Sequence, residues 1–247
     1  DILGDTIEKI SKEKAGIIKK NTPIYIFEQN ENIIEIIKKK SAKVNAPLTI
    51  IKSNDVETFT SNDLGSVFKY KGYNIKLPLI GGHQVQNCVL AIDIVEFVLN
   101  GINENILKVA ISKLSWPGRM EKLSEKNIYY DVAHNYDGIR ALINTIKKIH
   151  PKTRIVGLFC IKAEKNIELI CDELKKDFIK VIICQDKEKY LLSVKALSEI
   201  FKKEKINFLE GKSVKDGIRI LTNSNIGEYV GLIFGSHYIA KEVYSEF

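Results

Sequence analysis

The sequence predicts an α/β protein whose C-terminal half is a doubly wound, mostly parallel sheet. From about residue 115 onward, strand-sized apolar runs alternate with single segments of helical periodicity. Such alternation implies right-handed crossovers between parallel strands, with helices covering both faces of the sheet. Trp116-Pro117-Gly118 interrupts the pattern and is a natural linker. We therefore expect one domain at residues 1–114 and a second at residues 115–247.

The second domain is the more regular of the two. Its predicted strands span residues 128–133, 154–160, 181–185, 206–210 and 229–236. Its predicted helices span residues 137–149, 165–177, 192–204 and 213–224, and a last helix begins near His237. Each strand is followed by a single helix, as the doubly wound arrangement requires.

The first half mixes hairpins with helices. Its predicted helices lie at residues 6–14, 30–41, 81–100 and 104–113, and its predicted strands at 23–27, 48–51, 67–70 and 73–77. Lys71-Gly72 is a turn signal between the last two strands. Because no complete run of βαβ units is visible, this half is interpreted as the tail of a larger α/β domain.

Composition excludes several classes of protein. Hydrophobic residues make up 45% and charged residues 28% of the chain, as in globular rather than disordered proteins. No apolar run reaches the length of a membrane span or a signal-peptide core, so we expect a cytoplasmic protein without a membrane partner. The four cysteines are scattered without a CxxC pair, which favours a reducing compartment and disfavours a zinc site.

The net charge of +7 raises the question of nucleic-acid binding. The lysines are dispersed over predicted helices rather than gathered in one patch, so no nucleic-acid partner is predicted. An excess of positive charge is also compatible with polyanionic small substrates such as nucleotides.

Two segments in the first half carry polar residues at the edges of predicted elements. EKAGIIK, with Lys14, ends the opening helix; its alternative interpretation is a solvated helix end with Gly16 as the C-cap. GGHQVQN begins the long helix, where paired glycines and free N–H groups suit an anion. Gln84 and Asn87 each offer a donor and an acceptor, as an adenine edge requires. Ordinary N-terminal capping is the alternative.

A third segment runs from the linker to the first strand of the second domain. Arg119 in the linker can clamp a phosphate with two hydrogen bonds. Asp131, His134 and Asn135 follow at the carboxyl end of the strand, where open parallel sheets bind ligands. The alternative is a surface pair of Arg119 with Glu121 and a capping role for His134.

In their order and spacing, these segments resemble the folylpolyglutamate synthase/dihydrofolate synthase branch of the Mur ligase superfamily. The matching stretches are LGDTIEKISKEKAGIIKKNTPIY, GGHQVQNCVLAI, WPGRMEKL followed by DVAHNYDG, and FGSHY, within residues 3–238. The resemblance implies that residues 1–114 are the C-terminal part of a Mur ligase central, ATP-binding domain. It also implies that residues 115–247 are the Rossmann-like Mur ligase C-terminal domain.

The resemblance further implies an ATP- and Mg²⁺-dependent ligase that joins L-glutamate to dihydropteroate or tetrahydrofolate through an acyl phosphate. Lys14 matches a lysine that carries a carbamate and helps to hold Mg²⁺. Gln84 and Asn87 match residues at the adenine. The remaining matches are Arg119 at the ATP phosphates, Asp131 and His134 at the nucleotide and the transferring group, and Ser236 near the glutamate.

The chain also departs from the family pattern. No GxxGK[ST] phosphate-binding loop occurs in the sequence, Tyr136 replaces the usual proline, and Glu164-Lys165-Asn166 replaces Asp-Lys-Asp. The chain begins at Asp1 inside a loop-to-helix pattern, so we expect its partner to be a missing N-terminal half. By itself the chain is expected to be inactive. Another Mur-type amino-acid ligase and a non-catalytic nucleotide-binding module are the alternatives.

Overall fold

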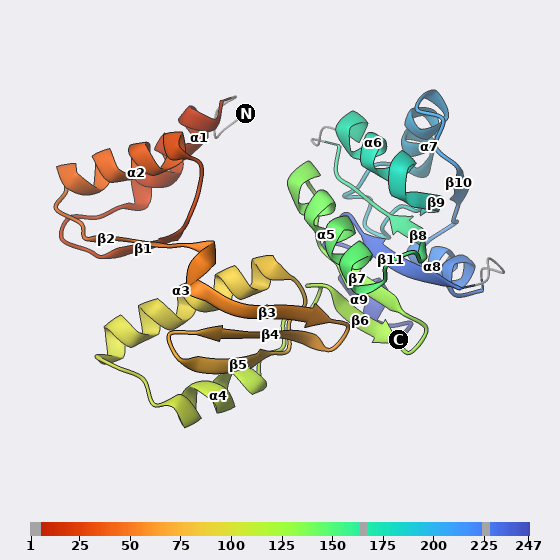
Figure 1. The fold of residues 1–247 in the computed structure, drawn as a ribbon. Coiled ribbons are helices and arrows are strands. Elements are labelled where there is room, and N and C mark those ends of the chain that lie inside the picture. Colours follow the sequence, from red (N-terminus) through yellow and green to blue (C-terminus); the bar gives the residue numbers. More distant parts are fainter. Residues whose placement is uncertain (1–5, 164–166, 224–227) are drawn as a thin grey trace. The chain divides into compact units, whose positions relative to one another are not determined.

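The computed structural model describes residues 6–163, 167–223 and 228–247, and the chain forms two compact units (Figure 1). The first unit consists of residues 1–60, 66–78 and 82–113, and the second of residues 61–65, 79–81 and 114–247. The assignment of residues 1–114 to an ATP-binding domain stays a prediction. Leu3–Asp5 of the opening LGDT stretch and Glu164–Asn166 lie outside the described residues.

The second unit is built on a six-stranded sheet with the strand order β10-β9-β8-β11-β7-β6. Its strands are β6 (Glu121–Ser124), β7 (Ile128–Asp131), β8 (Arg154–Phe159), β9 (Phe178–Ile183), β10 (Phe208–Glu210) and β11 (Tyr229–Phe234). Every neighbouring pair is parallel except β6 with β7. The predicted doubly wound, mostly parallel sheet is confirmed.

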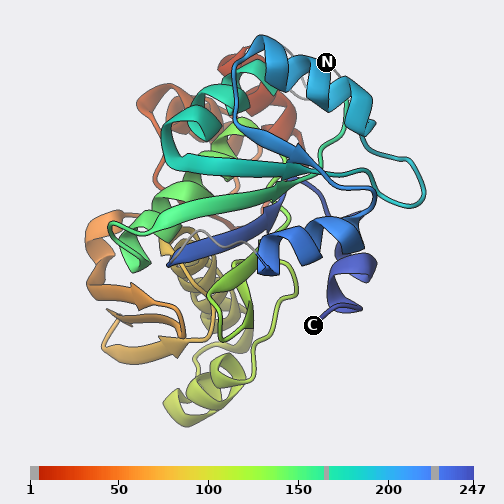
Figure 2. The same cartoon turned by 90° about the vertical axis from the view of Figure 1, so that its right-hand side faces the viewer.

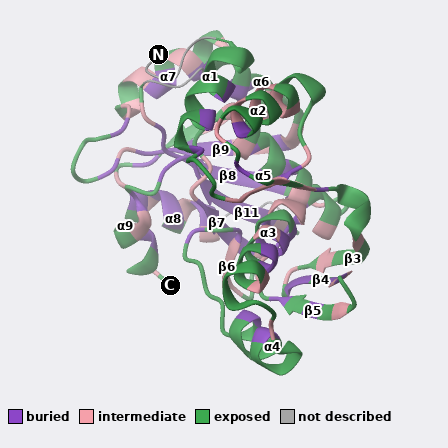
Figure 3. Cartoon of the chain, turned by 90° about the vertical axis from the view of Figure 1, so that its left-hand side faces the viewer, coloured by how far each residue is buried: buried purple, intermediate pink, exposed green. Residues whose placement is uncertain are grey.

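Helices cover both faces of this sheet (Figure 2). The helices are α5 (Tyr136–Ile149), α6 (Ile167–Asp177), α7 (Val194–Lys203), α8 (Val214–Thr222) and α9 (Ala240–Tyr244). Alternate strand residues face opposite sides: Tyr129 and Phe159 pack with α5, α6 and α7, whereas Tyr130 and Leu158 pack with α8 and α9. The strands β7, β8, β9 and β11 are accordingly buried along most of their length (Figure 3).

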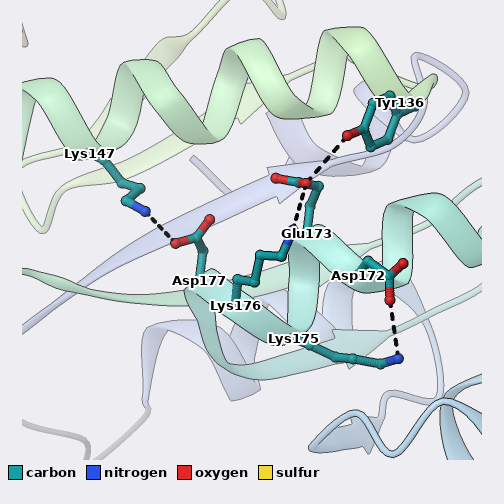
Figure 4. Close-up of polar contacts among 7 residues, drawn as sticks. All are labelled: Tyr136, Lys147, Asp172, Glu173, Lys175, Lys176 and Asp177. Carbon is teal, nitrogen blue, oxygen red and sulfur yellow. Dashed lines mark hydrogen bonds and ion pairs between the residues drawn. The ribbon is translucent and has the colours of Figure 1, made fainter.

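Polar contacts join α5 to α6 (Figure 4). The Lys147 Nζ of α5 lies 2.5 Å from Asp177 Oδ1 of α6, and the Tyr136 hydroxyl donates to Glu173 at 3.4 Å. Lys147 is more than half exposed, so the ion pair contributes little to stability beside the apolar contacts beneath it.

The order of the strands creates a topological switch point. The chain runs from β7 through α5 to β8 and onward to β10, and then returns through α8 to place β11 between β8 and β7. The connection after β11 therefore lies on the opposite face from those after β7 and β8. In open parallel sheets, ligands bind at the carboxyl ends of the strands at such a point.

The first unit opens with α1 (Ile7–Lys14), followed by a parallel βαβ unit made of β1 (Ile24–Phe27), α2 (Glu31–Lys43) and β2 (Leu48–Ile51). The strands and the helix of this unit were predicted at residues 23–27, 30–41 and 48–51, and the first half shows this one unit rather than a run of them. The Asn30 side chain caps α2 by accepting from the Ile33 N–H, which satisfies one unpaired donor of its first turn.

The rest of the first unit is an antiparallel sheet with two helices. Its elements are β3 (Val56–Asn62), β4 (Gly65–Tyr70), β5 (Tyr73–Leu77), α3 (Gly82–Leu99) and α4 (Glu104–Ser112). Lys71 and Gly72 both have positive φ, as a tight hairpin turn between β4 and β5 requires. The Tyr70 hydroxyl donates to the buried Asp93 of α3 at 2.8 Å, which ties the hairpin to that helix.

None of the helices in the described ranges is both long enough and apolar enough to cross a membrane.

Candidate functional site

Lys14 is the last residue of α1, and its side chain is exposed. The C-cap is Ala15, followed by a 3-10 turn over Ala15–Ile17, and Gly16 does not adopt a positive φ. The alternative interpretation of Gly16 as the C-cap is therefore wrong. The turn bends the chain directly after Lys14, and Lys14 is among the residues that line a pocket.

That pocket has a volume of about 550 Å³ and is lined by α1, β1, α2 and α3 of the first unit. Its size is typical of small-molecule sites. Most of its lining is apolar, and the polar residues among the lining are Ser11, Lys14, Tyr25, Gln29, Gln86 and Asn87. Lys14 and Asn87 are 73 positions apart in the sequence, and the fold brings both to this one pocket.

Gln84 is not among the residues that line the pocket. It is 7% exposed, and its Oε1 accepts a hydrogen bond from the Asn87 amide at 3.4 Å. The buried Gln84 therefore helps to orient the Asn87 side chain through this hydrogen bond. Gln86 lines the pocket and was missed by the sequence analysis, although an amide beside Asn87 on an exposed helix face was the available signal.

The second group of predicted residues lies at the carboxyl end of β7 in the second unit. Asp131 ends this strand and is 5% exposed. Its Oδ1 accepts from the Ala133 N–H at 2.7 Å and its Oδ2 from the Met120 N–H at 2.8 Å. Burial raises the pKa of this carboxyl group, while the two N–H donors and the nearby Arg119 and His134 oppose the shift.

Arg119 lies on a tight turn that Asp131 helps to hold. Gly118 and Met120 on either side have φ of 68° and 49°. The Gly118 N–H donates to the Glu121 carboxylate at 2.9 Å, and the Gly118 carbonyl accepts from the Val132 N–H at 2.9 Å. A Cβ at Gly118 would lie 2.7 Å from the Val132 side chain, so this turn needs glycine. The exposed Arg119 side chain thus extends from a fixed backbone.

His134 and Asn135 follow Asp131 in the loop before α5. The Asn135 side chain caps α5 by accepting from the Gly138 N–H at 2.8 Å, so the alternative that His134 is the cap was wrong. His134 is exposed, and its Nδ1 lies 3.0 Å from the Val132 carbonyl oxygen. Because a carbonyl only accepts, Nδ1 carries the proton in this bond, and Nε2 is left as the acceptor.

Ser236 follows β11, the strand next to β7. It is 3% exposed, its hydroxyl oxygen accepts from the Tyr238 N–H at 3.1 Å, and its carbonyl accepts from the Tyr130 hydroxyl at 2.9 Å. Gly235 before it has φ of 106°, and a Cβ there would lie 2.2 Å from the Cys160 carbonyl oxygen. Only glycine permits this close approach of two strand ends.

The four predicted residues of the second unit therefore lie on neighbouring segments. Arg119 and His134 are exposed and offer a guanidinium that can bind an anion and an imidazole nitrogen that can accept a hydrogen bond, whereas Asp131 and Ser236 are buried and hold the surrounding backbone. Such an arrangement is able to bind phosphate or carboxylate groups.

The described residues do not form a Mg²⁺ site by themselves. Among them, no group of three or more His, Cys, Asp or Glu side chains is placed to hold a metal ion. Gln29, Gln86 and Asn87 line the pocket together with Lys14. Their amide oxygens are hard donors of the kind that Mg²⁺ accepts, but they are neutral. A carbamate on Lys14 would add the missing negative charge.

A family profile for the Mur ligase glutamate ligase domain matches residues 118–237. The second half of this chain is a Mur ligase domain. Curated relatives extend the likeness beyond that domain: the dihydrofolate synthase/folylpolyglutamate synthase of Bacillus subtilis is 30% identical over 247 residues, covering 91% of this chain and 57% of the relative. The enzyme of the same name from Mycobacterium tuberculosis is 26% identical, covering 90% of this chain and 50% of the relative.

Solved structures share the fold of the Mur ligase domain and of the segment before it. The folylpolyglutamate synthase of Mycobacterium tuberculosis, complexed with ADP, matches 100% of this chain and 60% of its own length, with a TM-score of 0.87 and 23% identity. E. coli FolC in complex with DHPP and ADP matches 99% of this chain and 57% of its own length, with a TM-score of 0.81 and 21% identity. The resemblance to this family is confirmed.

A shorter match points to another branch of the superfamily. The UDP-N-acetylmuramoyl-L-alanyl-D-glutamate–L-lysine ligase of Enterococcus faecalis is 33% identical over 88 residues, or 34% of this chain and 16% of the relative. The chain spans about half the length of the curated dihydrofolate and folylpolyglutamate synthases that it matches, at 57% and 50% of the two above.

Proposed function

We propose that this chain is the C-terminal part of an ATP-dependent ligase that adds L-glutamate to dihydropteroate, tetrahydrofolate or both through an acyl phosphate. The observation that carries the proposal is the 30% identity to the Bacillus subtilis enzyme over 91% of this chain. The shared pocket of Lys14 and Asn87 supports it, because the resemblance assigns both residues to one nucleotide and its metal.

In the first unit, the pocket beside Lys14 and Asn87 is the proposed nucleotide site. The Asn87 amide, oriented by Gln84, would donate to and accept from an adenine edge. Lys14 would act as a carbamate, an oxygen ligand for a hard cation, which an ammonium group cannot be. Mg²⁺ and the carbamate both stay predictions from the resemblance.

In the second unit, Arg119 is the proposed phosphate-binding residue. ATP would supply the phosphoryl group that converts the acceptor carboxylate to an acyl phosphate, with ADP as the leaving group. A preorganised cation stabilises the charge that develops in such a transfer. The glutamate amine would then attack the acyl carbon, and phosphate would leave as the amide forms and the amine loses a proton.

His134 and Asp131 have different roles in this proposal. The Nε2 atom of His134 is the acceptor of an exposed imidazole and would contact the transferring group or the attacking amine. Asp131 is buried with both oxygens hydrogen-bonded, so it would act by positioning the Arg119 turn and the His134 loop. Ser236, also buried, would position the backbone near the glutamate.

The complete reaction is proposed for a longer protein that includes this chain, because this chain covers only 57% and 50% of the two aligned relatives. The proposed partner is an N-terminal part that supplies the phosphate-binding loop. A cytoplasmic location stays a prediction.

Nucleotide binding tests the site in the first unit. The chain is titrated with ATP, with and without Mg²⁺, as wild type, Asn87→Ala and the matched control Asn105→Ala on an exposed position of α4. Loss of an adenine contact is expected to weaken binding about tenfold in Asn87→Ala, with no change in Asn105→Ala. Equal affinities for all three proteins would remove Asn87 from the nucleotide site.

The match to a lysine-adding Mur ligase gives a second candidate, another Mur-type amino-acid ligase. The two candidates differ in the substrates that release phosphate. Release that depends on L-lysine and a muramoyl peptide, and not on glutamate and a pterin, would select the second.

A further inference from the structure

A pair of hydrogen bonds connects the helix α9 to the turn that carries Arg119. The Glu121 carboxylate of β6 accepts from two donors through its Oε2 atom: the Gly118 N–H at 2.9 Å and the Tyr244 hydroxyl. Tyr244 is the last residue of α9 and lies 123 positions after Glu121 in the sequence. Burial and the hydrogen bond to Glu121 raise the pKa of Tyr244, so its hydroxyl keeps the proton that it donates.

The helix α9 is a fixed support for that hydroxyl. Ile239 and Val243 are fully buried in the core on the α8 face of the sheet. The Tyr244 ring packs edge-on against the Tyr130 ring of β7, with centroids 5.8 Å apart. The Tyr130 hydroxyl in turn donates to the Ser236 carbonyl at 2.9 Å. Apolar packing and ring contacts therefore hold Tyr244 in place independently of its bond to Glu121.

The Arg119 turn needs such support. Its backbone has positive φ at Gly118 and at Met120, and a positive φ is unfavourable for a residue with a Cβ, such as Met120. The Glu121 side chain is only half-buried, and an unrestrained glutamate has several rotamers. The bond from Tyr244 selects the rotamer in which Oε2 meets the Gly118 N–H. Tyr244 thus acts on the turn through Glu121.

We propose that Tyr244 is a positioning residue for the ligase reaction, because its bond to Glu121 fixes the backbone from which Arg119 reaches the transferring phosphoryl group. The inference rests on the proposed function, in which Arg119 binds that group. A cation that must first be ordered stabilises the charge of a transition state less than one that is already in place. Tyr244 itself touches no substrate in this proposal.

Turnover by the complete protein, followed as phosphate release with ATP, Mg²⁺, L-glutamate and a pterin acceptor, tests the inference. Tyr244→Phe removes the hydroxyl and keeps the ring that packs on Tyr130. It is expected to lower kcat about tenfold and to change the KM for ATP less than about twofold, because the adenine contacts are proposed in the first unit.

The matched control is Tyr229→Phe, which is expected to leave kcat unchanged. The Tyr229 hydroxyl also donates within the second unit, to the Leu221 carbonyl of α8. It lies at the amino end of β11, whereas the Arg119 turn lies at the carboxyl end of the neighbouring parallel strand β7. The control therefore removes the same chemical group and a comparable hydrogen bond away from the turn.

A double variant separates positioning from a loss of stability. In the Arg119→Ala background, Tyr244→Phe is expected to lower kcat no further, since the side chain that it positions is gone. A purely structural role would lower kcat by the same factor in both backgrounds. Wild-type kcat in Tyr244→Phe, or an equal factor with and without the Arg119 side chain, would overturn the inference.

Amide exchange gives a readout that does not depend on turnover. The Gly118 N–H is expected to exchange severalfold faster in Tyr244→Phe than in the wild type, and at the wild-type rate in Tyr229→Phe. Unchanged exchange at Gly118 in Tyr244→Phe would overturn the inference even in an active ligase. Faster exchange in a wild-type-folded protein that releases no phosphate with either acceptor would instead count against the proposed function, with the hold of Tyr244 on the turn upheld.

Discussion

The buried carboxylate of Asp131 offers the sharpest test of how the second unit holds its exposed residues. Replacing Asp131 with Asn keeps the shape of the side chain. The amide oxygen can accept one of the two N–H groups, from Ala133 at 2.7 Å or Met120 at 2.8 Å, but the amide nitrogen cannot accept the other. One buried N–H group therefore loses its partner.

The expected loss in unfolding free energy at neutral pH is about 1–3 kcal/mol, the cost of an unsatisfied buried donor. Relief from burying a charge offsets part of it. Urea unfolding of the second unit, followed by hydrogen exchange at the Met120 and Ala133 amides, measures the loss. The control is Asp137→Asn, an exposed position in the first turn of α5, expected to change stability by less than about 0.5 kcal/mol.

The pH dependence gives the same variant a second readout. Burial raises the pKa of Asp131 above its ordinary value. The folded state thus favours the protonated carboxyl group. The stabilisation that this preference gives the fold is complete below the ordinary pKa of about 3.9 and is lost as pH rises through the raised folded-state pKa. The stability difference between wild type and Asp131→Asn should therefore narrow from pH 4 to 7. A difference that widens with pH, or unchanged protection at both Met120 and Ala133, would refute this reasoning.

Three further predictions concern the packing of each unit. Gly235→Ala should lower the melting temperature by several degrees, because its Cβ would lie 2.2 Å from the Cys160 carbonyl oxygen. The control Gly16→Ala should not lower it, because no atom lies within 4 Å of a Cβ there. Equal melting temperatures for the two variants would contradict the geometry. Tyr70→Phe should lower the free energy of unfolding by about 1 kcal/mol, because the hydrogen bond to a buried carboxylate of α3 is lost. The loss is measured as faster amide exchange in β4 and β5. Unchanged exchange would mean that the bond does not hold the hairpin. Burial raises the pKa of the Cys184 thiol to about 12, so it should react with Ellman's reagent at pH 8 only after unfolding, and prompt reaction in the folded protein would show that the thiol is accessible.

Most elements of the fold could be predicted because their sequence pattern is local. The strands β8 and β11 are apolar at nearly every position, as strands buried on both faces must be. Two strands were missed. β6 has only half-buried residues, and β3 is mostly exposed, with Thr58 at a positive φ inside it, so neither shows an apolar pattern. The last helix was expected near His237 but begins at Ala240, after a turn that the Ala240 N–H closes on the His237 carbonyl.

The candidate site was predictable in residue type but not in contacts. Asp131 and His134 could be placed at a strand end from the sequence, whereas the hydrogen bond from Met120 depends on how the linker folds back. The contact between the Tyr190 and Tyr238 rings could not be predicted, because it requires β11 to lie beside β8. The periodicity of the chain does not determine the order of the strands. Gln84 was predicted to contact adenine, but it is buried behind Asn87.

The most direct test of the central claim is phosphate release by the complete protein that carries this chain, given ATP, Mg²⁺, L-glutamate and either dihydropteroate or tetrahydrofolate. We expect release that requires both glutamate and a pterin acceptor and that falls sharply in Arg119→Ala. Folded protein that binds ATP but releases no phosphate with either acceptor would contradict it.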